Sequence, residues 1–442
     1  MKHLLRPLLI SLVSGSTLLL ALTARAETTA FVNVSVLPMD RDTVLTEQTV
    51  LVTGDRITAV GSRETVAVPD GARKIDGKGK FLMPGLGEMH GHNPAVGSSE
   101  AYVENIYFLF LSNGVTTVRS MLGWPGQLEL RDKVNRSQIL GPTLYLAGPS
   151  FAGNTVPSPA AAEARVREQK REGWDLLKVH PGLKRDTFDA MARTADELGI
   201  RFAGHIPIDV GLVHAIEKGQ ETVDHLDGYI EFLQAADGPI DPKKLNEIVR
   251  LTRETNTWVI PTMVLWETII GSASLDEMMR FPELQYMPRS QVEQWKASYE
   301  RRITHANYKK STAMTTAENR KILLKALHEG GAKIIFGTDA PQQFSVPGFS
   351  IHREIESMAS AGMSPFAILQ TATRNVGEYL KSRDTFGLVA PGHRADLLLL
   401  QGNPLSDLNE LSKRSGVMVR GQWIPESEIQ AGLARIAAES KN

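Results

Sequence analysis

Short apolar runs recur through the middle of the chain and alternate with helix-like segments. Eight of these runs read as buried strands. They span residues 87–90, 115–119, 144–147, 176–180, 202–205, 222–225, 258–262 and 334–338. Because strands that alternate with helices form parallel sheets, this order predicts an α/β fold of the (β/α)8, or TIM-barrel, class. An open doubly wound sheet is the alternative, but no glycine-rich phosphate-binding sequence follows the first strand.

Both ends of the chain show a different pattern, in which short β-rich runs are separated by turn signals such as Gly54-Asp55 and Asp76-Gly77. The runs lie at residues 31–37, 49–52, 56–60, 79–82, 395–400, 416–419 and 422–424. We expect the two ends, residues 27–82 and 386–442, to build one small β-sandwich-like domain. The barrel would then occupy residues 83–385.

The interval before the last barrel strand is unusually long. Residues 266–320 are rich in methionine, aromatic and charged residues at helical spacing, which predicts a helical insertion after the seventh strand. Loops that follow barrel strands lie on the catalytic face of a TIM barrel. The insertion therefore either caps the pocket or packs as an amphipathic helix pair on the barrel exterior.

The first 26 residues have the layout of a cleavable secretory signal. Lys2 and Arg6 precede an apolar run from Leu8 to Leu22, and Ala24-Arg25-Ala26 provides small residues for cleavage before Glu27. A membrane anchor is the alternative, but the run is short and is interrupted by Ser14-Gly15-Ser16. We expect a periplasmic or secreted protein that has no stable membrane anchor after cleavage.

Composition narrows the partners and the ligand chemistry. The 442 residues are 42% hydrophobic and carry a formal net charge of −1, so there is enough apolar material for a large core and no basic excess for nucleic acid. A small-molecule substrate is the expected partner, and a homo-oligomer stays open. Because the chain has no cysteine, it cannot form disulfides, and any metal must bind histidine and oxygen ligands.

Candidate metal ligands fall at the ends of the predicted strands. His90 and His92 are two residues apart and point the same way from a strand, so that both imidazoles can hold one ion. The other candidates follow later strands: Lys178, His205, His225 and Asp339. Barrel geometry brings strand ends to one mouth. Imidazoles and a carboxylate bind Zn²⁺ and leave a position for water, whose pKa the metal lowers to about 7.

Lys178 is unexpected in such a set, because an ammonium group beside metal cations is strongly disfavoured. Its amine is either neutral or has reacted with CO₂ to form an anionic carbamate that bridges two metals. The structural alternative is a lysine paired with a buried carboxylate.

Four further residues are candidates for catalysis or substrate binding. His180 lies two residues beyond Lys178 and either contacts the substrate or transition state or packs behind the ligands. Arg119, at the end of the second strand, either binds a substrate carboxylate or forms a structural ion pair. Tyr229 is a candidate hydrogen-bond donor to the oxyanion, and His352 is either a pocket residue or a helix-start residue.

Seven segments carry a family resemblance. They are Met83 to His92 (MPGLGEMHGH), Gly114 to Arg119 (GVTTVR), Leu177 to Val179 (LKV), Ala203 to Pro207 (AGHIP), Val223 to Leu226 (VDHL), Phe336 to Ala340 (FGTDA) and Pro391 to Leu397 (PGHRADL). In this order they resemble the amidohydrolase superfamily, and within it the imidazolonepropionase-like and prolidase-like branch. Asn93-Pro94 and Ser120 depart from the residues that many relatives carry, so the resemblance does not assign a relative's substrate to this chain.

The resemblance implies a centre of two divalent ions, with Zn²⁺ as the expected metal. His90 and His92 would hold one ion, His205 and His225 the other, and carboxylated Lys178 would bridge them. Asp339 would bind the first ion and act as general base, passing a proton from the metal-bridging hydroxide to the leaving amine.

The expected reaction is hydrolysis of an amide-type C–N bond in a peptide or N-acyl amino acid. The same site also suits a cyclic amide, a lactone or an ester. A periplasmic binding protein without turnover is the non-enzymatic alternative, although a binding role does not require an acid/base aspartate.

Overall fold

The computed structural model describes residues 27–95 and 97–441. The predicted signal peptide, residues 1–26, lies outside this range. Within the described part of the chain, no helix combines the length and the apolar character that a membrane crossing requires.

Eight parallel strands form the central ring of the molecule. Two hydrogen-bonded sheets contribute them, one of three strands and one of five. The strands are β6 (Leu86–Gly91), β7 (Val115–Ser120), β8 (Thr143–Leu146), β9 (Leu176–Val179), β10 (Arg201–Gly204), β11 (Thr222–Asp224), β12 (Trp258–Ile260) and β13 (Lys333–Ile334). A parallel bridge between Ala147 and Leu176 joins the sheets at one side, and the amide of Met89 donates to the carbonyl of Phe336 at the other. The predicted α/β fold with parallel strands is therefore confirmed.

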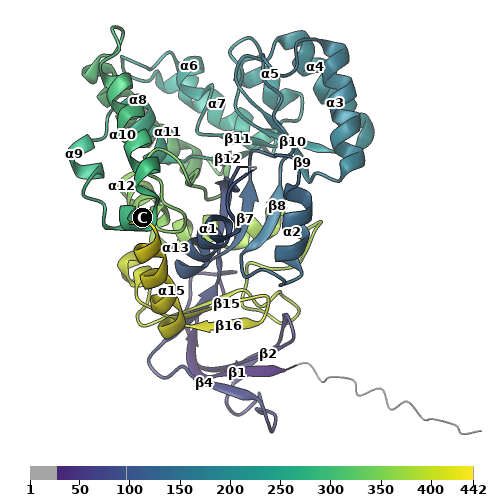
Figure 1. Ribbon diagram of the computed structural model, residues 1–442, viewed down its shortest axis with the longest axis vertical. Helices are drawn as coiled ribbons and strands as arrows, with labels where there is room; N and C mark the ends of the chain where they lie inside the picture. The colour runs from purple at the N-terminus through teal and green to yellow at the C-terminus, as the bar shows by residue number, and fades with distance from the viewer. Residues whose placement is uncertain (1–26, 96, 442) are drawn as a thin grey trace, which may run out of the picture.

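Helices follow the strands and surround them, as Figure 1 shows. Those after the first six strands are α1 (Glu100–Ser112), α2 (Gln127–Asn135), α3 (Pro159–Glu172), α4 (Arg185–Leu198), α5 (Leu212–Glu217), α6 (Tyr229–Leu233) and α7 (Pro242–Glu254). Their ends follow local sequence. In α3, the side chain of Ser158 caps the first turn, Pro159 supplies a preset φ, and Gly173 ends the helix in the left-handed conformation.

The long interval before the last strand is helical. It contains α8 (Met263–Ile270), α9 (Leu275–Met278), η1 (Pro282–Tyr286), α10 (Arg289–Ile303) and α11 (Lys310–Glu329). In Figure 1, α8 to α10 stand together on the left of the ring. Trp295 of α10 packs against Phe344, which follows β13, with ring centroids 5.9 Å apart. After β13 come α12 (Ser350–Ser360), α13 (Pro365–Ala372) and α14 (Arg374–Tyr379).

Both ends of the chain join in a second sheet of eight strands. Its hydrogen-bonded order is β16-β15-β14-β5-β1-β2-β3, with β4 paired to β1. The strands are β1 (Thr28–Val36), β2 (Leu45–Thr53), β3 (Arg56–Ser62), β4 (Arg73–Asp76), β5 (Phe81–Pro84), β14 (Leu397–Leu400), β15 (Arg414–Val419) and β16 (Gln422–Pro425). The short helix η2 (Leu408–Ser412) precedes β15, and α15 (Glu426–Glu439) follows β16. This sheet agrees with a β-unit built from both ends; its division into two facing layers, and the exact domain boundaries, stay predictions.

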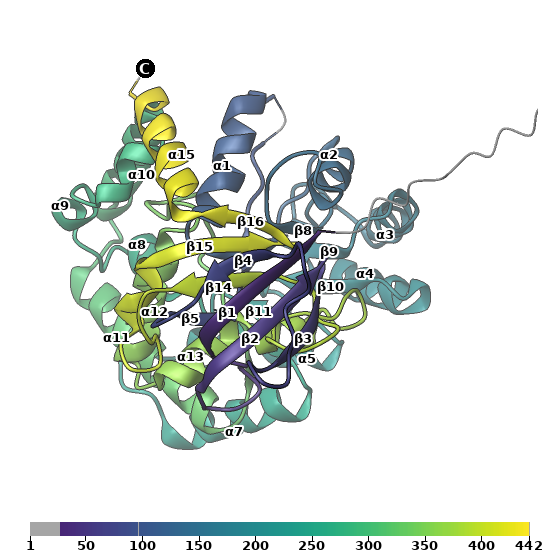
Figure 2. The ribbon, with the colours of Figure 1, turned by 90° about the horizontal axis from the view of Figure 1, so that it is seen from below.

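The second sheet lies across the lower end of the ring, as the view from below shows (Figure 2). Strand β5 leads through Gly85 directly into β6, so the sheet adjoins the amino-terminal ends of the barrel strands. Buried Arg394 fastens the two parts, because it pairs with Asp396 at 2.7 Å and donates to Thr117 Oγ1 of β7 at 2.8 Å. The carboxyl ends of the barrel strands are left free for a functional site.

Candidate metal centre

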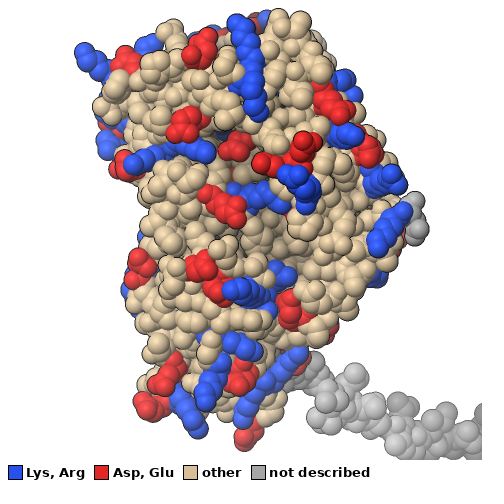
Figure 3. Space-filling model, turned by 90° about the vertical axis from the view of Figure 1, so that its left-hand side faces the viewer, with Lys and Arg blue, Asp and Glu red and all other residues tan. Residues whose placement is uncertain are grey.

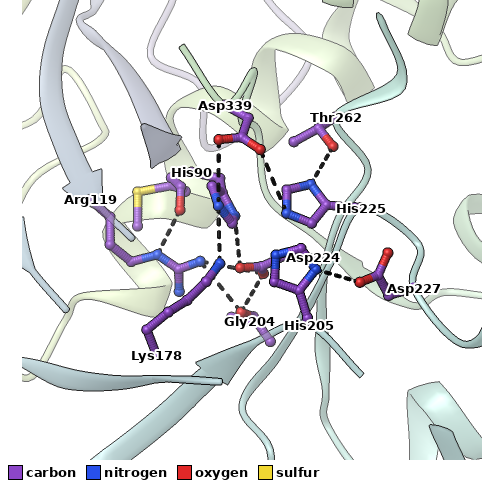
Figure 4. Close-up of polar contacts among 12 residues, drawn as sticks. His90, Arg119, Lys178, Gly204, His205, Asp224, His225, Asp227, Thr262 and Asp339 are labelled. Atoms are coloured by element: carbon purple, nitrogen blue, oxygen red, sulfur yellow. Dashed lines mark hydrogen bonds and ion pairs between the residues drawn. The ribbon is translucent and has the colours of Figure 1, made fainter. Parts of the chain in front are cut away.

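The ends of five barrel strands bring the six predicted ligands into one region. His90 and His92 come from β6 and the residue after it, Lys178 from β9, and His205, His225 and Asp339 follow β10, β11 and β13. Figure 4 shows five of these side chains around a common centre. One ligand atom each from His90, His225 and Asp339 lies within 4.8 Å of the other two, and all three residues are buried.

The Asp339 carboxylate is the hub of this cluster. Its Oδ1 lies 2.5 Å from His92 Nε2 and 3.7 Å from His90 Nε2, and its Oδ2 lies 3.7 Å from His225 Nε2. Asp339 Oδ1 is nevertheless buried without a hydrogen bond, which is rare for a carboxylate oxygen. An oxygen without a donor, surrounded by imidazole nitrogens, fits a divalent metal ion.

Lys178 lies beside this hub. Its Nζ is 3.2 Å from His90 Nε2, and the side chain is fully buried. Burial lowers the pKa of Lys178 to about 8, although the nearby carboxylates of Asp224 and Asp339 act in the opposite direction. A larger share of the amine is therefore neutral than in an exposed lysine, and the neutral amine is the form that reacts with CO₂.

His205 and His180 form the far side of the cluster. Asp227 Oδ2 lies 2.6 Å from His205 Nδ1. This contact occupies Nδ1 and leaves Nε2 as the ring nitrogen that could bind a metal ion. The ring of His205 lies 4.6 Å from that of His225 and stacks at 5.0 Å on that of His180. Burial and the neighbouring Lys178 lower the pKa of His180 to about 2, so this imidazole is neutral. His180 lies at the edge of the cluster, and its contact with the substrate stays a prediction.

The backbone is strained at the ends of three neighbouring strands. His225, Thr262 and Asp339 have φ angles of 65°, 40° and 64°, in the left-handed region that residues other than glycine rarely adopt. Such conformations cost about 1–3 kcal/mol each and persist only where the surroundings impose them. Here Thr262 Oγ1 bonds His225 Nδ1 at 2.8 Å, and buried Arg320 of α11 donates to the carbonyls of His225 at 2.7 Å and Pro261 at 3.1 Å.

Several functional neighbours were missed from the sequence. Asp224 is fully buried, and its Oδ2 lies 2.8 Å from His90 Nδ1. Glu88, also fully buried, accepts from the amides of Thr338 at 2.8 Å and His90 at 3.1 Å, and so ties β6 to the end of β13. The available signal was an acidic residue within a short strand that the sequence predicts to be buried, which burial tolerates only when the residue is paired.

Two residues that depart from the family pattern lie side by side. Ser120 Oγ accepts a hydrogen bond from the amide of Asn93 at 2.9 Å, and both residues are buried. Ser120 therefore supports the segment that follows His92.

Three predicted roles are corrected by the structure. Arg119 is fully buried and donates to the carbonyl of Met89 at 2.6 Å and to the hydroxyl of Tyr379 at 2.7 Å, with Asp224 at 3.5 Å. It cannot reach a substrate carboxylate without breaking this network, so the structural ion pair is the correct reading.

The hydroxyl of Tyr229 is likewise engaged elsewhere. It shares a hydrogen bond of 2.8 Å with Thr252 of α7, and the side chain belongs to the core between α6 and α7 rather than donating to an oxyanion. His352 lies 3.3 Å from Asn113 Oδ1 at the end of α1, and burial lowers its pKa to about 4. It lies in the first turn of α12 and contacts the end of α1, which agrees with the alternative of a helix-start residue.

Charge on the outer surface is mixed. The face seen in Figure 3 carries positive and negative side chains interspersed, and neither sign gathers into a patch. This agrees with the net charge of −1 and offers no basic surface to nucleic acid on that face.

The family model for the amidohydrolase family matches residues 81–424, well over half of the chain. Among solved structures, a bottromycin amidohydrolase matches with a TM-score of 0.75 and 21% identity, over 94% of this chain and 91% of the other. A Xaa-Pro dipeptidase with bound methionine matches with a TM-score of 0.68 and 21% identity, over 90% and 100%. The ochratoxinase of A. niger matches with a TM-score of 0.66 and 17% identity, over 91% and 96%. No curated protein sequence matches this chain significantly.

Proposed function

Because this chain belongs to the amidohydrolase family, we propose that it is a metal-dependent hydrolase that cleaves an amide-type C–N bond. The observation that carries the proposal is the convergence of His90, His225 and Asp339, whose ligand atoms lie within 4.8 Å of one another at the open end of the barrel. Residues that are 249 positions apart in the chain, from 90 to 339, meet there in a buried cluster.

The proposed centre holds two divalent ions, with Zn²⁺ as the expected metal. His90, His92 and Asp339 would hold the first ion, His205 and His225 would hold the second, and Lys178, carboxylated by CO₂, would supply an anionic ligand. The burial of Lys178 and the position of its Nζ, 3.2 Å from His90 Nε2, support its inclusion in the centre.

When bound, the ions would polarise the substrate carbonyl and make water more acidic at neutral pH. The chain itself supplies the proton transfer. Asp339, with one oxygen free of hydrogen bonds, accepts a proton and delivers it to the leaving amine. Neutral His180, whose ring stacks on that of His205 at 5.0 Å, is proposed to contact the substrate or transition state. Burial of the cluster keeps bulk water from competing for these contacts.

The names of similar proteins support an amide substrate. One solved structure is a Xaa-Pro dipeptidase, another an amidohydrolase of bottromycin, and another an ochratoxinase. We therefore propose a peptide or an N-acyl amino acid as the substrate.

The test is a hydrolysis screen of dipeptides, N-acyl amino acids, lactones and esters with the metal-loaded protein. We expect turnover of an amide, and a loss of at least about a thousandfold in kcat for Asp339→Asn. Asp132→Asn, a change at an exposed carboxylate on α2, is the control. Binding without turnover in every class would refute the enzyme, and metal analysis that gives fewer than two ions per chain would refute the binuclear centre.

Export is a separate proposal. The sequence of residues 1–26 supports secretion to the periplasm or medium, with cleavage before Glu27. Amino-terminal sequencing of the mature protein would reveal Glu27 as the first residue; an intact Met1 on the purified periplasmic protein would contradict cleavage.

A further inference from the structure

A cavity of about 660 Å³ adjoins the second half of the candidate metal centre. We call it the β9–β12 pocket, because the segments that line it follow those four strands: residues 181–185, 206–214, 227–232 and residue 266. Pro181 and Ile206 come directly after His180 and His205 in the chain. Two of the segments that line the pocket therefore begin at the residue after a histidine of the cluster.

Two side chains belong to both places. Asp227 lines the pocket and contacts His205 Nδ1 at 2.6 Å. Trp266 of α8 lines the pocket, and its ring lies 5.6 Å from that of His225. A group bound in the pocket would therefore lie next to the His205 and His225 side of the centre.

The wall of the pocket is mostly apolar. Its apolar residues include Ile206, Pro207, Ile208, Val213, Phe232 and Trp266. Ile208, on the loop after β10, is 92% exposed, which is unusual for a large aliphatic side chain and unfavourable in water. An apolar group of a ligand would cover it.

The charges in the pocket disfavour an anionic group. Three carboxylates line it, those of Asp209, Asp227 and Glu231, against the two cations of Lys184 and Arg185. Both cations are engaged: Lys184 Nζ lies 2.6 Å from Asp209 Oδ2, and Arg185 donates to the carbonyl of Val210 at 2.7 Å. A substrate carboxylate would meet net negative charge, because three carboxylates face two cations and one of these, Lys184, already pairs with Asp209.

We propose that the β9–β12 pocket seats a bulky, uncharged apolar group of the substrate, a branched aliphatic or aromatic side chain or acyl group, and rejects an acidic one. This inference rests on the proposed amide hydrolysis and names the substrate class of the same site. The group lies on one side of the scissile bond, beside His205 and His225.

Two dipeptide series test the proposal with the metal-loaded protein. In one the amino-terminal residue is Gly, Val, Leu, Phe or Asp before a constant Ala, and in the other the carboxyl-terminal residue varies after a constant Ala. In one of the two series, kcat/KM should rise at least about tenfold from Gly to Phe, since one pocket-filling group discriminates by about that much. The Asp member of that series should be the poorest substrate.

Matched variants assign the preference to this pocket. Ile208→Ser should reduce the Phe-to-Gly ratio of kcat/KM at least threefold, and the fold should tolerate it because Ile208 is 92% exposed. Ile322→Ser is the control, because Ile322 is an exposed isoleucine of α11 that does not line the pocket. It should leave the ratio unchanged.

The outcomes separate this inference from the proposed hydrolysis. Turnover without an apolar preference, or with a preference that Ile208→Ser does not alter, would overturn the pocket assignment and leave the hydrolase standing. If no class of substrate in the hydrolysis screen is turned over, calorimetric Kd values for the same dipeptides replace kcat/KM. An apolar preference in Kd that Ile208→Ser weakens would then support the pocket while the hydrolase fails, and no preference would overturn both.

Discussion

The contact between Asp227 and His205 should control the affinity of the second metal position. Asp227→Asn keeps the size of the side chain and an oxygen acceptor for His205 Nδ1, but it removes the negative charge that lies 2.6 Å from the ring. A carboxylate partner fixes the orientation of a metal-binding imidazole and makes it a better donor. The substitution therefore tests the effect of the Asp227 charge separately from the effect of the orientation of His205.

The expected magnitude follows from the contact. A hydrogen bond to a charged group is worth about 1.5–3 kcal/mol, and both side chains are largely buried, with 16% and 14% exposed. At about 1.4 kcal/mol for each factor of ten, the affinity for one ion should fall about 10- to 100-fold, while the other ion is less affected.

Asp189→Asn is the matched control. Asp189 Oδ1 lies 2.6 Å from His214 Nε2, the same separation, in a carboxylate and histidine pair that joins α4 to α5. Bound metal would be measured over a series of buffered free Zn²⁺ concentrations for the wild type and both variants. A shift below threefold for Asp227→Asn, or an equal shift for Asp189→Asn, would refute the assignment of His205 as a ligand oriented by Asp227.

Three further predictions concern stability and the proposed carboxylation of Lys178. Gly204→Ala places a Cβ 2.5 Å from the carbonyl oxygen of Val179, whereas the Cβ of Gly219→Ala, also at a positive φ, meets nothing within 4 Å. Urea denaturation should show that Gly204→Ala is less stable than Gly219→Ala by about 1–3 kcal/mol. Equal losses of stability in the two variants would contradict the clash. Burial raises the pKa of Glu354 from 4.5 to about 7, so the folded state binds more protons than the unfolded state between these values. The free energy of unfolding should fall by up to about 3 kcal/mol as pH rises through that window, and Glu354→Gln should flatten the fall; an unchanged pH profile would refute it. Finally, ¹³C NMR of protein loaded with metal and ¹³C-bicarbonate should show a carbamate signal that Lys178→Ala abolishes; its absence from the wild type would exclude the carboxylated lysine.

The main outline of the site could be predicted because barrel topology is regular. Once His90, Lys178 and Asp339 were placed at strand ends, parallel connections alone required them to share one mouth. The same regularity predicted which segments are strands. It did not predict side-chain direction at Arg119, which lies at a strand end as the ligands do but points inward to Asp224 and Tyr379.

Local backbone geometry explains what was missed at β11. In a regular strand, adjacent residues face opposite sides, so His225 as a ligand would place Asp224 away from the cluster. The φ of 65° at His225 breaks this alternation, and both neighbours face the cluster, with Asp224 2.8 Å from His90 Nδ1. The left-handed conformation of His225 depends on its tertiary contacts with Thr262 and Arg320, which the hydrophobic periodicity of the sequence does not predict.

The pairing of β5 with β14 also sets the order in which the chain can fold. Leu82 and Met83 of β5 pair with Leu399 and Leu398 of β14, so the strand that leads into His90, already paired with β1, gains its second neighbour only after about nine-tenths of the chain has been made. Until then the side of β5 away from β1 is an open edge, and Arg394 cannot yet reach Thr117 of β7. A chain that stops short of β14 would carry every candidate metal ligand and still lack this support for the first barrel strand. Synthesis must therefore be almost complete before β5 is paired on both sides, which would delay hydrolytic activity until nearly the whole chain is available.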